Sequence, residues 1–261
     1  MALGGRPGVE VEASTNTVRE MDEPYLTRIS ASARDDADYA LAIPAIRSLV
    51  ETPLELDPRV SFFVGDNGSG KSTLVEAIAV ASKLNAEGGG RVQSFQFATR
   101  SSHSKLHEAL VLEGSKRKPV NAFFLRAESF FNFATAAEER PIEQLYDRPL
   151  HEQSHGESFL SLVLERFGPN GLYVLDEPEA ALSVHGQLAL MRRMHELVEL
   201  DSQFVVATHS PILLGYPQAS IFELGDDGLA RVVYEDTEPY RLTKGFLDDP
   251  NAFLRHLLDG D

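Results

Sequence analysis

Residues 65–72 read Gly65-Asp66-Asn67-Gly68-Ser69-Gly70-Lys71-Ser72. This segment fits the phosphate-binding loop pattern G-x-x-x-x-G-K-[ST] at every fixed position. An apolar run at 60–64 comes directly before it and is typical of a buried parallel strand, and a helical pattern follows from Ser72 to about Leu84. Because the motif needs a strand before it and a helix after it, the segment predicts a nucleotide polyphosphate as ligand, with magnesium. The alternative is a glycine-rich turn that carries a lysine by chance.

The chemistry of this loop follows from its residue types. Its glycines let backbone N–H groups point inward around a phosphate, and the start of the following helix adds a partial positive charge. Lys71 would reach the β- and γ-phosphates, and Ser72 would give its hydroxyl oxygen to Mg²⁺. The predicted nucleotide-binding residues are Gly65, Asp66, Asn67, Gly68, Ser69, Gly70, Lys71, Ser72 and Thr73.

The composition describes an ordinary globular chain of 261 residues, 43% hydrophobic and 25% charged. It has no cysteine, which excludes a disulfide framework and a thiolate metal site. No apolar stretch approaches the roughly 18 residues of a membrane span, so we expect a cytoplasmic protein. Residues 1–20 lack the apolar core of a secretion signal and predict a disordered leader before a single domain at 21–261.

The formal net charge of −16 makes the whole surface a poor candidate for sequence-independent nucleic-acid binding. Cations nevertheless gather within residues 91–118, either as a local basic patch or, the interpretation we favour, as a solvated loop. Nucleic acid is therefore a possible partner, but the negative net charge of the chain does not favour its binding. The cations in this region are Arg91, Arg100, Lys105, Lys116, Arg117 and Lys118.

Apolar runs and helical patterns alternate along the rest of the chain. This order predicts an α/β fold with a mostly parallel sheet flanked by helices. A polar, mixed segment at about 128–160 predicts a small helical insert. Strands are expected at 41–43, 60–64, 92–97, 121–126, 172–175 and 204–207, with a hairpin from 221–224 and 229–234. Helices are expected at 72–84, 157–167, from the Ser183 cap to about 200, and over 242–258. The helix at 157–167 is expected to place Phe159, Leu160, Val163 and Leu164 on its apolar face.

Two apolar strands end in polar residues that suit phosphate chemistry. The first ends in Asp176 and Glu177. Asp176 would hold Mg²⁺, directly or through water, and Glu177 would orient the attacking water. The second ends in Thr208-His209-Ser210, where His209 could hydrogen-bond the γ-phosphate. The alternatives without a function are that Asp176 and Glu177 are an acidic pair on the surface, and that His209 is an ordinary hydrogen-bonded histidine. The predicted catalytic residues are Glu177, His209 and Lys71, and the predicted metal ligands are Ser72 and Asp176.

The segment Gln153-Ser154-His155-Gly156-Glu157 precedes a helix, whose N-terminus favours an anion. Here the chain resembles the ABC-type ATPases, whose signature is commonly Leu-Ser-Gly-Gly-Gln. The serine and the second glycine match, while His155 replaces a glycine and Glu157 replaces the glutamine. These departures distance the chain from ordinary transporter subunits.

Two further stretches look like the soluble, AAA-named branch that contains RecF- and SMC-like ATPases: 176–179, Asp-Glu-Pro-Glu, and 207–211, Ala-Thr-His-Ser-Pro. The resemblance covers about residues 40–235. It implies the fold of a P-loop NTPase, with an ABC-ATPase-like, mostly parallel sheet flanked by helices. It also implies a Mg²⁺-dependent ATPase that binds ATP and forms an ATP-dependent homodimer. In that dimer the signature residues Ser154, His155, Gly156 and Glu157 of one copy would cover the nucleotide of the other.

Some expectations stay open at this point. The family's Q-loop is either near Gln96 or near Glu128, and order along the chain favours Glu128. Tyr39 is the best candidate to stack on adenine, although an aromatic here also suits a core. The cellular role is either a cytosolic ATPase linked to DNA maintenance or defence, or the ATP-binding subunit of a membrane transporter. A module that holds ATP without turnover is a third possibility, against which the carboxylate of Glu177 argues.

Overall fold

A computed structural model describes residues 23–32, 39–56, 59–86, 88–90, 104–128 and 155–258 of the chain. Its centre is a six-stranded sheet in the order β5-β6-β7-β3-β8-β9, in which every neighbouring pair is parallel except the last. The predicted mostly parallel α/β fold is therefore confirmed. The strands are β3 (Val60–Gly65), β5 (Asn121–Arg126), β6 (Gly171–Asp176), β7 (Gln203–Ala207), β8 (Ser220–Gly225) and β9 (Gly228–Val232).

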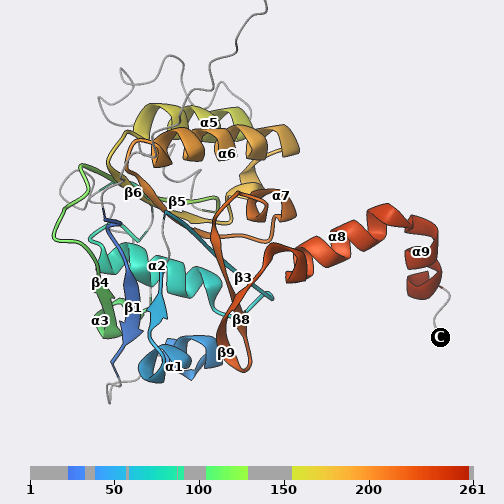
Figure 1. The fold of residues 1–261 in the computed structure, drawn as a ribbon, viewed down its shortest axis with the longest axis horizontal. Helices are drawn as coiled ribbons and strands as arrows, with labels where there is room; N and C mark the ends of the chain where they lie inside the picture. Colours follow the sequence, from blue (N-terminus) through green and yellow to red (C-terminus); the bar gives the residue numbers. More distant parts are fainter. Residues whose placement is uncertain are drawn as a thin grey trace, which may run out of the picture.

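Helices cover both faces of this sheet (Figure 1). On one face lie α5 (His155–Arg166), α6 (Val184–Val198) and the short α7 (Pro211–Leu214). On the other lie α1 (Pro44–Glu51), α2 (Lys71–Ala81) and a small antiparallel sheet in the order β2-β1-β4. The remaining elements are β1 (Arg28–Ala31), β2 (Leu54–Glu55), β4 (Leu110–Glu113), α3 (Leu106–Ala109), α8 (Glu238–Asp248), α9 (Pro250–Leu258) and the 3₁₀ turns η1 (Tyr39–Ala42), η4 (Pro178–Ala181) and η5 (Tyr234–Asp236).

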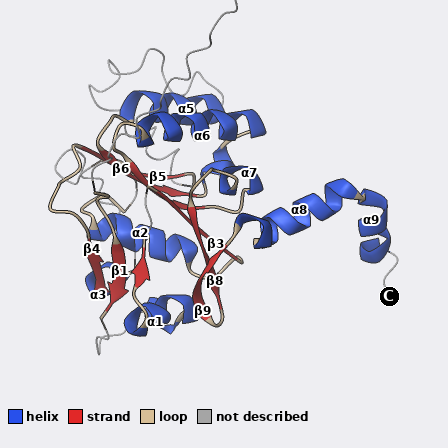
Figure 2. Cartoon of the chain, viewed as in Figure 1, coloured by secondary structure: helices blue, strands red, loops and turns tan. Residues whose placement is uncertain are grey.

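Two hydrophobic clusters fill the layers on either side of the sheet. In β3, Phe63 packs in the cluster with α1 and α2, and its neighbours Phe62 and Val64 pack in the cluster with α5 and α6. Because both faces are covered, such a strand has no polar side and appears in the sequence as a continuous apolar run. The cartoon in Figure 2 shows the strands between the two helical layers.

Local signals in the sequence set several element boundaries. Ser183 caps α6, where its hydroxyl accepts a hydrogen bond from the backbone N–H of Gly186 at 3.2 Å, as expected of a helix cap. The predicted hairpin also forms, with Gly225 paired to Gly228 across the turn. Gly228 has φ +115°, a conformation that glycine adopts without strain.

Two expectations about local structure are wrong. Residues 41–43 form no strand: they belong to η1 and to the cap of α1, because Pro44 has its φ preset for the first turn of a helix. In α5, Leu164 was expected on the apolar face, yet its side chain is exposed and Leu162 is buried instead. The expected strand at 92–97, the leader at 1–20 and most of the expected insert lie outside the described residues. Within the described parts of the chain, none of the helices is long and apolar enough to span a membrane.

Candidate functional site

The carboxyl ends of four parallel strands meet at one edge of the sheet. There β3 runs into the loop 65–70, β6 ends in Asp176 and Glu177, and β7 leads to His209. The fourth strand, β5, ends at Arg126, which is in register with Asp176. The crevice beyond the carboxyl ends of an open α/β sheet is where ligands bind. The fold therefore brings the residues predicted from three separate segments to one edge.

The loop 65–70 has the backbone that its glycines predict. Gly65 has φ +148°, and a Cβ there would lie 2.5 Å from the carbonyl oxygen of Leu224 in the neighbouring strand. Gly70 has φ +98°, and a Cβ there would press on the side chains of Ile43 and Ile46 at 3.1–3.2 Å. Both positions therefore require glycine. The tip of the loop, residues 66–68, is exposed to solvent.

Lys71 is held inside this loop at the start of α2. Its Nζ donates hydrogen bonds to the carbonyl oxygens of Gly65 and Asp66, both at 2.8 Å, and the residue is buried. Burial lowers the pKa of the Lys71 ammonium, while the nearby carboxylates of Glu177 and Asp176 act in the opposite direction. A buried ammonium group that is held beside a helix N-terminus is suited to bind phosphate oxygens.

Asp176 lies beside Ser72, and the hydroxyl of Ser72 is hydrogen-bonded to its carboxylate. Burial raises the pKa of Asp176 to about 6, against the opposing effects of the Arg126 guanidinium and the Ser72 hydrogen bond. Its Oδ1 is buried without a hydrogen-bond partner. A carboxylate oxygen and a hydroxyl are hard ligands of the kind Mg²⁺ prefers.

These two residues therefore fit a magnesium ion. Among the described residues, no group of three or more His, Asp or Glu side chains is placed to hold a metal by itself. This suits Mg²⁺, which commonly takes one or two protein ligands and completes its shell with water and substrate phosphates. Ser72 and Asp176 would hold the ion.

Arg126 is a part of the site that the sequence did not predict. Its Nε lies 3.2 Å from Oδ2 of Asp176, and its Nη1 donates to Oε2 of Glu76 in α2 at 2.8 Å. The guanidinium thus compensates two carboxylates and leaves Oδ1 of Asp176 free. A charged residue at the end of the apolar stretch 121–125 was the signal that could have revealed it.

Glu177 and His209 face each other across the end of the sheet. His209 Nε2 lies 3.7 Å from Oε1 of Glu177, and both side chains are partly exposed. Glu177 has φ +49°, a left-handed conformation that costs a non-glycine residue about 1 kcal/mol or more. Its backbone is held there by the N–H of Glu177, which donates to the carbonyl of Ala207 at 2.9 Å. Strained residues of this kind concentrate at functional sites.

Glu179, a second residue missed from the sequence, fixes the backbone of His209. Its Oε1 accepts a hydrogen bond from the N–H of His209 at 2.5 Å. The two acidic residues that follow β6 therefore act differently: the side chain of Glu177 faces the His209 ring, and that of Glu179 holds the His209 main chain.

The predicted signature is only partly within the described residues. Ser154 lies outside them, and of His155 only the backbone at the start of α5 is described. Gly156 packs closely on η4, where a Cβ would lie 3.1 Å from the carbonyl oxygen of Ala181. Glu157 lies in the first turn of α5. The signature helix is thus in contact with the segment that directly follows Glu177.

Two of the candidates for the Q-loop and for the aromatic that stacks on adenine lie within the described residues. Glu128 follows β5, is 87% exposed, and lies 3.7 Å from Nη2 of Arg126. Tyr39 is exposed at the start of η1, and Gln96 is outside the described residues. Within the cation-rich region 91–118, Arg117 lies over the ring of Tyr25 and hydrogen-bonds Asn170, which ties it to the fold. Arg91 and Arg100 are outside the described residues.

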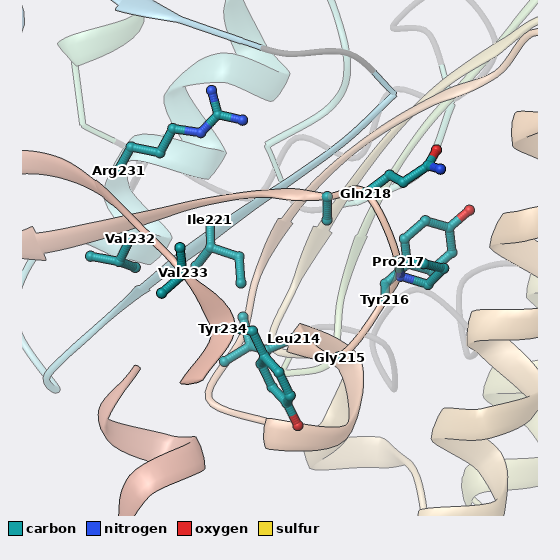
Figure 3. A pocket seen from close by; sticks show the side chains of 11 residues that line it. Leu214, Gly215, Tyr216, Pro217, Gln218, Ile221, Arg231, Val232, Val233 and Tyr234 are labelled. Carbon is teal, nitrogen blue, oxygen red and sulfur yellow. The ribbon is translucent and has the colours of Figure 1, made fainter. Parts of the chain in front are cut away.

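A cavity of about 350 Å³ lies away from this edge, at the amino end of β8 (Figure 3). Its walls come from residues 214–219, from Ile221 and from residues 231–234, and none of the predicted site residues lines it. It is therefore separate from the candidate nucleotide site.

Comparisons with known proteins match the part of the chain that carries the loop 65–70. The family described as an AAA domain matches residues 40–137, which include the loop and Arg126. An ABC transporter ATP-binding protein of Sulfurisphaera tokodaii is 26% identical over 214 residues, covering 73% of this chain and 42% of that protein. The DNA replication and repair protein RecF of Leptospira interrogans is 48% identical over 46 residues, covering 18% of this chain and 13% of RecF.

Among solved structures, the SMC head domain from Thermotoga maritima aligns with a TM-score of 0.43 and 17% identity, over 80% of this chain and 98% of that one. The chain spans less than half the length of the relatives it matches by sequence. The chain is therefore similar to the AAA-domain family, to an ABC transporter ATP-binding protein and to RecF, which agrees with the resemblance stated from the sequence.

Proposed function

We propose that this chain binds ATP with Mg²⁺ and hydrolyses it at the carboxyl edge of the central sheet. The observation that carries the proposal is the convergence of Lys71, Ser72 and Asp176 on one side of the site with Glu177 and His209 on the other. One group of residues binds phosphate and metal. The other provides a base and a hydrogen-bond partner near the place where the γ-phosphate would lie.

In this mechanism the loop 65–70 and Lys71 bind the phosphates of ATP. Ser72 and Asp176 would hold the magnesium ion, which would supply positive charge to the phosphate oxygens. Glu177 orients a water molecule, whose oxygen attacks the γ-phosphorus while the bond to the ADP oxygen breaks. The proton of that water passes to the Glu177 carboxylate and then to the phosphate product. His209 hydrogen-bonds the γ-phosphate.

The nucleotide site of one copy is proposed to be completed by a second copy. The N-terminus of α5 carries Gly156 and, before it, Ser154, and a helix N-terminus favours an anion. In a head-to-tail dimer this helix would cover the γ-phosphate bound by the other copy. Because Gly156 contacts η4, closing the dimer would also affect the position of η4, which directly follows Glu177.

The cellular role we propose is that of an ATPase acting in DNA maintenance or defence. The RecF match and the altered signature support it. The net charge of −16 restricts any DNA contact to a local surface. The alternative is a transporter subunit, favoured by the ABC transporter ATP-binding protein that aligns with most of this chain. The two roles differ in their partner and share the same ATPase site.

The test is ATP hydrolysis with Mg²⁺ by the wild type and by Glu177→Gln, with and without DNA. We expect turnover by the wild type, its loss in Glu177→Gln, and retained ATP binding by the variant. Stimulation by DNA supports the DNA-linked role, and co-purification with a membrane protein supports the transporter role. Equal hydrolysis by both proteins would contradict the assignment of Glu177.

A further inference from the structure

The last two helices of the described chain form an arm that extends from the body (Figure 1). This C-terminal arm comprises α8 and α9, residues 238–258, and α8 contains no buried residue. Its base is anchored to the body through Tyr234: the hydroxyl of Tyr234 donates to the carbonyl of Pro211 at 2.7 Å, and its ring lies 4.6 Å from that of Tyr240. The arm is therefore attached at one end and open to solvent along its length.

Each helix of the arm is amphipathic. In α8, Leu242 and Phe246 are four residues apart and share a face, which Leu247 extends around the helix. In α9 the large apolar side chains recur at a spacing of three and four residues, which places them on one helical face. Phe246 of α8 and Phe253 of α9 are in edge-to-face contact, with ring centroids 5.8 Å apart. This contact joins the two faces into one surface. The exposed apolar residues are Leu242, Phe246, Leu247, Phe253, Leu254, Leu257 and Leu258.

This surface is large for a solvated arm. A half-exposed Leu or Phe presents on the order of 100 Å², so these residues together present roughly 700 Å², close to the ~800 Å² that each partner contributes to a stable interface. Patches on monomers are typically about 300–600 Å². The area matches what one half of a dimer interface needs.

Charge favours a second copy as the partner. The chain as a whole carries a formal charge of −16, which opposes contact between two bodies. The arm contains three acidic residues, Glu238, Asp248 and Asp249, and three basic ones, Arg241, Lys244 and Arg255. Because its charges balance, two arms can pack together without the repulsion that the rest of the chain would impose.

A groove at the base of the arm can receive the tip of the arm of a second copy. A groove of about 290 Å³ lies between α7 and α8, with Pro211 and Ile212 on the body side and Tyr240, Thr243 and Leu247 on the arm side. Helix α8 is about 16 Å long, and α9 begins almost directly at its end. When two α8 helices lie antiparallel, the tip of each reaches the base of the other, and α9 meets this groove.

We propose that the C-terminal arm is a dimerisation element. Two copies pack their arms antiparallel about a two-fold axis, and α9 of each copy places its apolar side chains in the groove beside α8 of the other. The same patch contacts itself in both copies, which closes the assembly at two. This dimer needs no nucleotide and is independent of the proposed ATPase activity. By holding two copies together, it raises the effective concentration of the second nucleotide-binding partner.

The first test is the mass of the full chain without nucleotide, measured by sedimentation equilibrium. We expect a dimer for the wild type and a dissociation constant about 100-fold weaker for Phe246→Gln combined with Leu257→Gln. The matched control, Glu238→Gln combined with Arg241→Gln, also adds two glutamines, keeps the net charge and changes the polar side of α8. We expect it to remain dimeric.

Equal melting temperatures of the three proteins would show that the body is intact in each. A monomeric wild type, a double variant that still dimerises, or an open series of larger assemblies would each overturn the proposal.

The second test uses the absence of cysteine from the chain. Copies carrying Thr243→Cys are mixed with copies carrying Leu257→Cys and then oxidised. We expect disulfide-linked dimers that contain one copy of each variant to exceed dimers of either variant alone. Equal yields would overturn the antiparallel packing. A further variant combines Glu177→Gln with Phe246→Gln and Leu257→Gln, and its association on addition of ATP is measured. Because this variant lacks the arm contact, the measurement reports on the ATP-dependent dimer alone, and failure of that dimer can be distinguished from failure of the arm dimer.

Discussion

Arg126 and Asp176 are register partners in adjacent strands, and their side chains form an ion pair with Nε and Oδ2 3.2 Å apart. The same guanidinium bonds Glu76 of α2 at 2.8 Å. One cation therefore connects the strand that carries the proposed metal ligand to the helix that begins at the loop 65–70. The orientation of Asp176 depends on it, because the Arg126 contact involves one oxygen and leaves the other free.

Arg126→Gln should destabilise the fold and weaken metal binding. It leaves two carboxylates, Asp176 and Glu76, without their shared cation, and we expect a loss of about 2 kcal/mol in the free energy of unfolding. The affinity for Mg²⁺ in the presence of ATP should fall about tenfold, as for other residues that orient a metal ligand. Chemical denaturation and a Mg²⁺ titration of nucleotide binding measure the two effects. Arg126→Lys is the matched variant and should retain part of both, and unchanged Mg²⁺ affinity in Arg126→Gln would contradict the orienting role.

The raised pKa of Asp176, about 6, gives the site a pH dependence. The folded protein binds this proton more tightly than the unfolded chain. The contribution of Asp176 to the free energy of unfolding is therefore present below pH ~4 and is lost as the pH rises through about 6. Metal binding has the opposite dependence, because Mg²⁺ requires the carboxylate. Below pH 6 we expect the apparent Mg²⁺ affinity to fall up to about tenfold per pH unit.

Mg²⁺ titrations of a fluorescent ATP analogue from pH 5 to pH 8 measure this dependence. Asp176→Asn serves as the control, since it cannot titrate and should bind Mg²⁺ weakly at every pH. A wild-type affinity that is flat across this range would show that Asp176 does not hold the metal.

Glu179→Ala should impair turnover while leaving nucleotide binding intact. Without this side chain the N–H of His209 loses its acceptor at 2.5 Å, and the loop after β7 loses the contact that holds it near Glu177. If His209 acts on the γ-phosphate as proposed, kcat should fall about tenfold with KM nearly unchanged. Steady-state kinetics measure this split. Glu179→Gln keeps an acceptor oxygen and should lose less, and a change confined to KM would place Glu179 in substrate binding instead.

Gly65→Ala should destabilise the chain by about 2–3 kcal/mol. The new methyl group would lie 2.5 Å from the Leu224 carbonyl oxygen, and the φ of +148° is unfavourable for alanine. Gly225→Ala is the matched control near the same strand pair, since a Cβ there meets nothing within 4 Å. Thermal denaturation of both variants checks the difference. Equal melting temperatures would mean that the loop can shift to accept a side chain.

The sequence was most informative where chemistry requires a continuous segment. The loop 65–72, the apolar strands before Asp176 and His209, and the Ser183 cap all lie where the sequence predicted them. It was misleading at residues 41–43, where an apolar run suits a strand and a helix start equally and Pro44 favours the helix. Short apolar runs carry no period by which the two can be told apart.

Contacts between distant segments were beyond prediction from local pattern. The side chain of Gln203 both donates to and accepts from the backbone of Leu26, 177 residues earlier, with bonds of 2.7 and 2.8 Å. The pairing of Arg126 with Asp176, and of Glu179 with the His209 backbone, is of the same kind. No local signal marks such partners, because each depends on the order in which the strands assemble.

By itself the sequence determined the proposed ligand class and the residues proposed to bind it, because phosphate binding needs a short glycine-rich loop followed by a helix. Only the tertiary structure decided that Arg126 and Glu179 support that site and that the apolar faces of α8 and α9 remain exposed. Those properties arise from strand order, register and the direction in which a helix leaves the body. They depend on contacts formed after the segments pack, so the local composition of any one segment does not contain them.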